Sequence, residues 1–128
     1  MIISAQTNGN FSTSSGSWTP IPGLVVTVPE IAGEAVLFVL NVPNPYASGD
    51  NYPGGNFGIH FNGEMQGPFA AFTYGEKAPS TPGRVPTTLY VAATNMSGKG
   101  PTTVTAMWSS IRNSTVHIDS PATLTMIL

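Results

Sequence analysis

The chain has 128 residues, of which 8% are charged, and its formal net charge is −2. A soluble domain usually contains about 25% charged residues, so neutral Ser, Thr, Asn and Gly side chains take the place of charges here. The four basic residues form no run that would neutralise successive phosphates, which disfavours nucleic acid as a partner. The absence of cysteine excludes disulfides, thiolate chemistry and Cys-based zinc sites.

The length fits one domain, over residues 1–128, with a single hydrophobic core. The start, Met1 to Asn10, has no basic region and only a short apolar run, so we expect no conventional secretory signal, and the localisation stays open. The longest apolar run, 35–40, is far shorter than the roughly 20 residues that span a bilayer, so we expect no membrane insertion.

Residues 7–20 are rich in Thr, Ser, Asn and Gly around Phe11 and Trp18. This composition is typical of a flexible linker, but the two aromatics favour an ordered edge segment. From Gly23 onward, short apolar or alternating runs separated by Gly, Pro and Asn predict strands joined by tight turns. Strands are expected over 24–28, 35–42, 56–61, 69–74, 87–94, 102–108, 116–119 and 123–128. This pattern predicts an all-β, two-sheet sandwich, with most of the 12 prolines between the strands.

Two apolar segments bear on assembly. Residues 35–40 are apolar on both faces of the expected strand, so we expect both faces to be covered. Residues 124–128 are almost wholly apolar at the chain terminus. Either a subunit interface or a final core strand explains that ending.

The side-chain types of a hydrolase triad occur together in His117, Asp119 and Ser120. Strand periodicity places His117 and Asp119 on one face and Ser120 on the other, so we expect no triad and no enzyme. His60 is expected at an ordinary half-buried or surface position of a strand. Glycoside hydrolysis needs a pair of carboxylates. Glu30 with Glu34, or Asp50 with Glu64, could form such a pair, but the sequence gives no sign that either does.

Metal and phosphate sites also lack a sequence signal. His60, His117 and Asp119 would have to converge from three separate positions, and no run of alternating Asp resembles a calcium loop. The glycines at 54–55 and 98–100 do not match a phosphate loop and are expected to form hairpin turns. We therefore expect no metal and no cofactor.

Three loop clusters, at 44–49, 72–84 and 110–114, mix an aromatic or an arginine with hydroxyl groups. A neutral sugar needs an aromatic ring for its apolar C–H face, and arginine or amide donors for its oxygens. Arg84 and Arg112 are the only arginines of the chain. Taken singly, each is explained by a surface ion pair, so only the joint occurrence of these groups suggests glycan binding.

A family resemblance adds to this interpretation. The runs at 21–24 (IPGL), 40–47 (LNVPNPYA), 51–54 (NYPG), 72–74 (FTY), 83–84 (GR) and 117–120 (HIDS) resemble the tumour-necrosis-factor-like fucose-binding lectin family. That bacterial domain forms the N-terminal half of a two-domain Burkholderia superlectin. The resemblance runs from about residue 21 to the end, whereas residues 1–20 diverge. It implies a jelly-roll sandwich, a compact homotrimer, and calcium-independent binding of fucosylated or related glycans in clefts between protomers.

The resemblance also implies site residues. One protomer would contribute Tyr46, Thr81 and Arg84, and its neighbour would contribute Thr73, Tyr74 and Arg112. His117, Asp119 and Ser120 would lie near the rim, within reach of a longer oligosaccharide.

Two positions depart from the family pattern. Asn56 stands where the family has a second cleft tyrosine, so an amide replaces an apolar wall. Thr81-Pro82 stands where the family has Ser-Thr, although a shift of one residue would make Ser80-Thr81 equivalent. These departures leave the sugar open, and they allow an alternative in which the chain is a TNF- or C1q-like protein-interaction or scaffold module without sugar binding.

Overall fold

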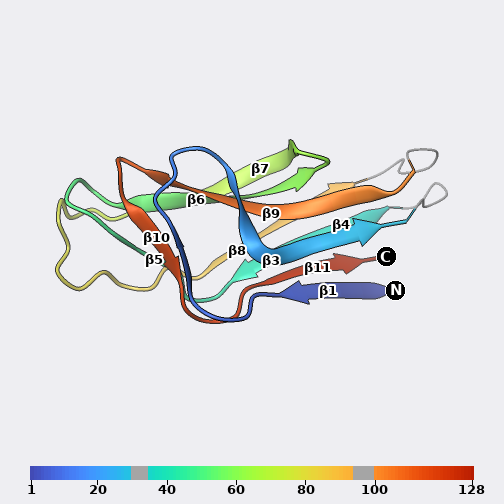
Figure 1. The fold of residues 1–128 in the computed structure, drawn as a ribbon, viewed down its shortest axis with the longest axis horizontal. Coiled ribbons are helices and arrows are strands. Elements are labelled where there is room, and N and C mark those ends of the chain that lie inside the picture. Colours follow the sequence, from blue (N-terminus) through green and yellow to red (C-terminus); the bar gives the residue numbers. More distant parts are fainter. Residues whose placement is uncertain (30–34, 94–99) are drawn as a thin grey trace.

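The computed structural model describes residues 1–29, 35–93 and 100–128 (Figure 1). Within these ranges the chain forms eleven strands and no helix: β1 (Ile2–Gln6), β2 (Phe11–Thr13), β3 (Thr19–Val28), β4 (Val36–Val42), β5 (Tyr46–Ser48), β6 (Gly54–Phe61), β7 (Glu64–Thr73), β8 (Thr87–Ala93), β9 (Thr102–Ile111), β10 (Thr115–Ile118) and β11 (Thr123–Ile127). A helix with the length and apolarity needed to cross a membrane does not occur in the described ranges.

The strands form two four-stranded antiparallel sheets and one small sheet. The first large sheet has the order β1-β11-β4-β8 and the second has the order β3-β9-β6-β7. Figure 1 shows the small sheet, β2-β10-β5, at the end of the molecule opposite the two termini. The expected all-β sandwich architecture is therefore compatible with the structure.

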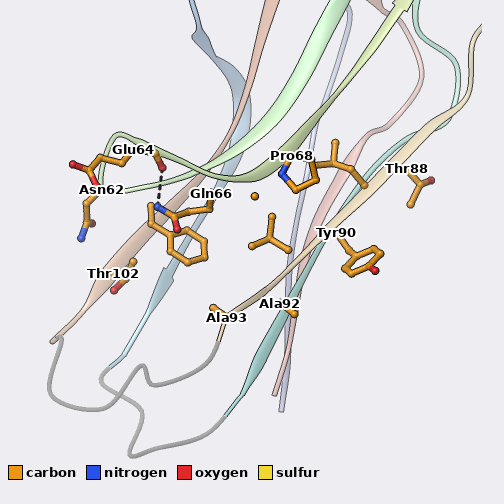
Figure 2. A pocket seen from close by; sticks show the side chains of 13 residues that line it. Asn62, Glu64, Gln66, Pro68, Thr88, Tyr90, Ala92, Ala93 and Thr102 are labelled. Atoms are coloured by element: carbon orange, nitrogen blue, oxygen red, sulfur yellow. Dashed lines mark hydrogen bonds between the residues drawn. The ribbon is translucent and has the colours of Figure 1, made fainter.

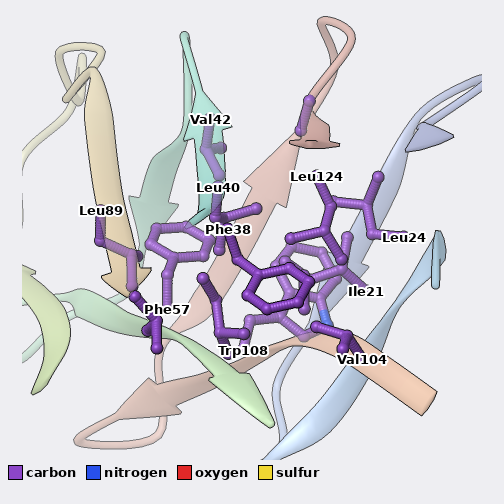
Figure 3. Close-up of a cluster of buried hydrophobic side chains, with 14 of the residues drawn as sticks. Ile21, Leu24, Phe38, Leu40, Val42, Phe57, Leu89, Val104, Trp108 and Leu124 are labelled. Carbon is purple, nitrogen blue, oxygen red and sulfur yellow. The ribbon is translucent and has the colours of Figure 1, made fainter. Parts of the chain in front are cut away.

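The core lies between the inner faces of the two large sheets (Figure 3). Burial alternates along β4. Phe38 and Leu40 are fully buried, whereas the residues that precede each of them, Leu37 and Val39, are only partly buried. From the second sheet, Phe57 and Trp108 fill the space against them. Because successive side chains of a strand point to opposite faces, this alternation fixes which residues each sheet presents to its outer surface.

All eight strands expected from the sequence occur, with shifted boundaries, and three further strands occur as well. The additional strands are β1, β2 and β5. Strand β1 lacks a strong apolar pattern and forms because it pairs with β11 from Ile2↔Ile127 to Gln6↔Thr123. The segment 7–20 was expected to be ordered, and this is confirmed for β2, which pairs with β10. Thr94, the last residue of one expected strand, lies outside the described residues.

Gly54 and Gly55 are not a hairpin turn, contrary to the expectation above. Both lie in β6, where β7 and β9 flank them closely. A Cβ atom added at Gly54 would lie 2.1 Å from the carbonyl oxygen of Phe72, and one added at Gly55 would lie 2.4 Å from Cγ2 of Val116. These glycines therefore permit close approach of neighbouring chain segments rather than a reversal of direction. Of the other glycine pair, position 98 lies outside the described residues.

A bulge interrupts the pairing of β6 with β7. Phe57 pairs with Ala70 and Ile59 pairs with Gln66, so residues 67–69 of β7 lie opposite a single residue of β6. Gly67 has a φ of 66°, a backbone conformation that favours glycine. Strand β7 is the edge of its sheet, so the bulge lies at the border of the sandwich.

Candidate functional site

The small sheet brings together two of the aromatic side chains that the sequence analysis singled out. Tyr46 of β5 is the pairing partner of His117 of β10, so both side chains lie on the same face. Their rings stack with centroids 4.5 Å apart and an interplanar angle of 10°. Each ring therefore fixes the orientation of the other.

Arg84 lies over this stacked pair. Its guanidinium carbon is 4.5 Å from the centroid of the Tyr46 ring, within cation–π range. Its Nη1 donates to Oδ1 of Asp119 at 2.6 Å and to the carbonyl oxygen of Asn44 at 3.1 Å. The guanidinium group holds the pKa of the Asp119 carboxyl below its usual range, so the carboxylate is ionised at neutral pH. We refer to Tyr46, Ser48, Arg84, His117 and Asp119 as the Arg84 cluster.

His117 makes a further contact, to Ser48 Oγ, 2.9 Å from its Nε2. Burial lowers the pKa of His117, which favours the neutral imidazole at neutral pH. A serine–histidine pair acts as a nucleophile and base when a third group orients the ring. Among the described residues, the Asp119 carboxylate is paired with Arg84 instead, so the geometry is that of a fixed polar surface.

A small hollow opens beside the Arg84 cluster. Its volume is about 280 Å³, and Tyr46, His117 and Asp119 line it. Asn10, Phe11 and Ser12, from the segment where the family resemblance was weakest, also line it, and Ser12 pairs with His117.

Tyr74 joins the Arg84 cluster to the neighbouring loop. Its hydroxyl donates to the carbonyl oxygen of Gly83 at 2.6 Å and accepts from the backbone N–H of Ala47 at 3.1 Å. These contacts place Tyr74 beside Arg84 within one chain. Thr81 is exposed in the loop between β7 and β8, two residues before Gly83.

Arg112 and Thr73 form a second cluster, which holds a stretch of main chain. Arg112 Nε donates to the carbonyl oxygens of Asn51, at 3.0 Å, and Tyr52, at 2.9 Å. Its Nη2 donates to the same Tyr52 oxygen at 2.5 Å and also to Thr73 Oγ1. The Thr73 hydroxyl in turn donates to the Tyr52 oxygen at 3.0 Å. We refer to Tyr52, Thr73 and Arg112 as the Arg112 cluster.

The backbone at Arg112 explains how its side chain reaches this loop. Arg112 and Asn113 have φ values of 49° and 57°, and Ser114 N–H donates to the carbonyl oxygen of Ile111 at 3.0 Å. These are the features of the two-residue turn that joins strands of matching twist. The turn leads from β9 into β10, so Arg112 and Asp119 lie at opposite ends of β10.

Asn56 lies apart from both clusters. Its neighbour Phe57 is buried in the core, so the alternation of β6 directs Asn56 to the outer face of the sheet. There its amide nitrogen donates to Ser109 Oγ at 3.0 Å. The structure therefore brings Tyr46, Tyr74 and Arg84 together and Thr73 and Arg112 together, but does not bring Asn56 to either group.

Asn44, Ser48, Asn51 and Tyr52 were not named as individual site residues, although Asn44 and Ser48 lie in the loop cluster expected at 44–49. Asn44 and Tyr52 contribute main-chain carbonyl oxygens, which any residue type supplies and which no sequence motif marks. Ser48 contributes a side chain, and its position two residues after Tyr46 places it on the same face of β5. That spacing was a usable signal.

A larger groove lies elsewhere, between β7 and β8 (Figure 2). These strands are the edges of the two large sheets, and the groove between them has a volume of about 1020 Å³. Its walls include Gln66, Thr88 and Tyr90, whereas the residues of both arginine clusters lie outside it. For the described part of the chain, no three His, Asp or Glu side chains are grouped as metal ligands.

Comparison with protein families gives one match. The family model described as the N-terminal domain of Bc2l-C matches residues 8–127. This span includes both arginine clusters and begins within the segment that the sequence analysis treated as divergent. Comparison with curated proteins gives no sequence match.

Solved structures with similar folds share little sequence with this chain. Dimeric latent PorU from Porphyromonas gingivalis has a TM-score of 0.60 at 13% identity over 98% of this chain. The insecticidal delta-endotoxin Cry8Ea1 from Bacillus thuringiensis has a TM-score of 0.49 at 15% identity over 92% of this chain. The sugar-binding C-terminal domain of EclA has a TM-score of 0.47 at 10% identity, over 91% of this chain and 79% of that domain. This chain spans 12% of PorU and 19% of Cry8Ea1, and the similarity to PorU supports the fold alone.

Proposed function

Because this chain belongs to the family of the Bc2l-C N-terminal domain, a lectin-like family, we propose that it is a non-enzymatic lectin for fucosylated or related glycans. In this proposal the fold is a jelly-roll sandwich, and the protein assembles as a trimer whose calcium-independent sites lie between protomers. The observation that carries the proposal is Arg84, held between the Tyr46 ring and the Asp119 carboxylate.

The Arg84 cluster has the chemistry that a neutral sugar requires. A guanidinium group has five N–H donors, and the two protein hydrogen bonds of Arg84 both come from Nη1. The Nε and Nη2 hydrogens therefore point to partners outside these contacts, and adjacent sugar hydroxyls fit such a fork. His117 and Arg84 already contact the faces of the Tyr46 ring, so Tyr46 would offer the exposed edge of its ring to the C–H groups of the sugar.

The hollow beside this cluster supports an extended glycan. Asn10 and Ser12 add an amide and a hydroxyl to the lining, beside His117 and Asp119. A second sugar unit, linked to the one at Arg84, would meet these neutral polar groups there. Ser120, the residue after Asp119, would add a hydroxyl group nearby.

The outer face of the β1-β11-β4-β8 sheet supports the trimer. Ile2 is 70% exposed and Tyr90 is 66% exposed, although both side chains are large and apolar or aromatic. The strand registers place these two in rows with apolar and neutral polar side chains: Ser4, Gln6, Leu37, Val39, Asn41, Thr88, Ala92, Thr123, Thr125 and Ile127. A neutral face of this kind is suited to burial against further copies of the chain. In such a trimer, Thr73 and Arg112 of one protomer would face Tyr46, Thr81 and Arg84 of the next, and Tyr74 would lie beside Arg84 of its own chain.

The alternative, a protein-interaction or scaffold module, is favoured by one observation. The amide of Asn56 is bonded to Ser109 where the family pattern has a cleft tyrosine. If that tyrosine is essential for sugar binding, the fold would keep its assembly and lose the sugar.

A glycan array with fucosides and other neutral sugars tests the proposal. We expect binding to fucosylated glycans that survives EDTA, and a trimeric mass by light scattering. Arg84→Ala should lower the affinity by about 10-fold or more, because it removes charge-assisted hydrogen bonds. Thr27→Ala, an exposed change on β3 away from both clusters, should bind like the parent. A stable trimer that binds no glycan would favour the scaffold module, and a monomeric mass would exclude shared clefts.

A further inference from the structure

We propose that Tyr52 is a sugar-contacting side chain and forms the aromatic wall of the Arg112 half of the site. This inference rests on the proposed lectin function and adds a binding residue that neither the sequence analysis nor the family resemblance assigned. It is carried by the backbone conformation, the hydrogen bonding and the exposure of Tyr52.

Tyr52 has a φ of 49°, in the left-handed region. Residues other than glycine, asparagine and aspartate rarely adopt this conformation, and a bulky aromatic residue does so at a cost in free energy. The other non-glycine residues with positive φ in the described ranges are Asn62, in the turn between the paired strands β6 and β7, and Arg112 and Asn113, in the short turn between β9 and β10. Tyr52 instead lies in the longer connection between β5 and β6, over residues 49–53.

The surrounding residues impose this conformation on Tyr52. Its N–H donates to the carbonyl oxygen of Lys77 at 2.8 Å, and its own carbonyl oxygen accepts from Arg112 and Thr73. The main chain is thus held on both sides of the residue. Strained residues persist where their surroundings over-determine them, and they cluster at binding sites.

The strained backbone conformation of Tyr52 does not bury its ring in the core. The Tyr52 side chain is 44% exposed, and it is absent from the core that the two sheets enclose. The hydrogen bonds that fix its main chain come from Arg112 and Thr73, so the ring projects from the same loop that these residues hold. The result is an exposed aromatic side chain on a main chain whose carbonyl oxygen is bound by the Arg112 guanidinium group.

This placement supplies the group that the departure at Asn56 removes. Asn56 lies on the outer face of β6 with its amide engaged by Ser109. Tyr52 offers an aromatic surface on the Arg112 side, where the C–H face of a deoxysugar requires one. The fixed main chain reduces the ordering that binding would require.

Substitutions that tolerate positive φ separate a binding role from a structural one. Tyr52→Gly and Tyr52→Asn relieve the backbone strain, so the urea midpoint should stay equal or rise. The affinity for methyl α-L-fucoside, measured by calorimetry, should fall by about 10-fold in both variants. Tyr52→Phe keeps the ring and should stay within about 3-fold of the parent. Asn62→Gly relieves the same backbone conformation in the turn after β6 and should leave the affinity unchanged.

Two results would overturn the inference. Affinity of Tyr52→Asn equal to that of the parent would remove Tyr52 from the site and leave the lectin function intact. Failure of the unaltered protein to bind the fucoside or any arrayed glycan would overturn the lectin function itself, and this inference with it.

Discussion

Arg84 and Arg112 lie at opposite ends of β10 and use their guanidinium groups on different partners. Arg84 is bound largely by side chains, through the Asp119 carboxylate and the Tyr46 ring. Arg112 is bound largely by main-chain oxygens, those of Asn51 and Tyr52. The first arrangement presents a charged group to the surroundings, whereas the second fixes the course of a loop.

This difference shows that residue type alone does not assign a role. Both arginines match the family pattern in identity, and both were expected to contact a sugar. The hydrogen bonds of Arg112 add a positioning role, which acts through Tyr52. Three variants or conditions test this contrast, starting with the largest expected effect.

Added side-chain volume should lower stability more at Gly54, which packs beside Thr73 of the Arg112 cluster, than at Gly83, which lies beside Arg84. Gly54→Ala places a methyl group 2.1 Å from the Phe72 carbonyl oxygen and 2.8 Å from Thr73 Cα, both main-chain atoms. We expect the free energy of unfolding in urea to fall by about 3 kcal/mol or more. Gly83→Ala, beside Arg84, meets no atom within 4 Å and is the matched control. Equal stability of the two variants would contradict the close packing described for β6.

Loss of each arginine should affect different properties. Arg112→Ala leaves the loop carbonyls of Asn51 and Tyr52 to water, and we expect a loss of about 1 kcal/mol in urea unfolding. Arg112→Lys should behave similarly, because a single ammonium does not reproduce the planar fork. Arg84→Ala should leave the unfolding midpoint nearly unchanged, because its ion pair is exposed, but should reduce glycan binding. A larger stability loss at Arg84 than at Arg112 would reverse the assignment.

Of the two arginine clusters, only the Arg84 cluster should respond to acid. The folded protein lowers the pKa of Asp119, so the ion pair stabilises the fold above the ordinary carboxyl pKa, and this contribution is lost as the pH falls through the lowered value. Burial lowers the pKa of His117, so stability also begins to fall below its ordinary value of 6.5. Melting temperatures between pH 7 and pH 3 should therefore decline less in Asp119→Asn than in the parent. Arg112→Ala should keep the slope of the parent, and identical slopes in all three proteins would contradict the contrast.

Most of the sheet could be predicted from the sequence because burial alternates with residue position. The run around Val104 shows this alternation directly, whereas the run around Phe38 is continuously apolar, and each forms a strand. Strands β1 and β5 could not be found in this way, since they depend on the partner strands that pair with them. The glycines at 54 and 55 were misassigned because a close approach between strands leaves no local signal distinct from a turn.

The candidate site was predicted in its residue types more than in its arrangement. Tyr46 and Arg84 converge within one chain, and Tyr74, which the resemblance assigned to the neighbouring protomer's half, lies beside them in the same chain. Asn56 was placed by the resemblance at the position of a cleft tyrosine. Strand alternation beside the buried Phe57 would have directed its amide away from the core. The role of Tyr52 depends on a backbone dihedral angle and on three hydrogen-bond partners distant in sequence, the donors Thr73 and Arg112 and the acceptor Lys77, which no motif encodes.

The bulge of β7 changes the edge that this sparsely charged sheet presents to other chains. Exposed edge strands invite pairing with other molecules, and proteins commonly block this with lysines or other charges. This chain has only four basic residues, and β7 carries a single charged residue, Glu64, at its start. Pro68 lies within the bulge, where it provides no N–H donor and the strand departs from regular pairing. Backbone geometry at this edge therefore protects against fibril-like stacking in place of electrostatic repulsion, and replacing Pro68 would expose a longer regular edge to aggregation.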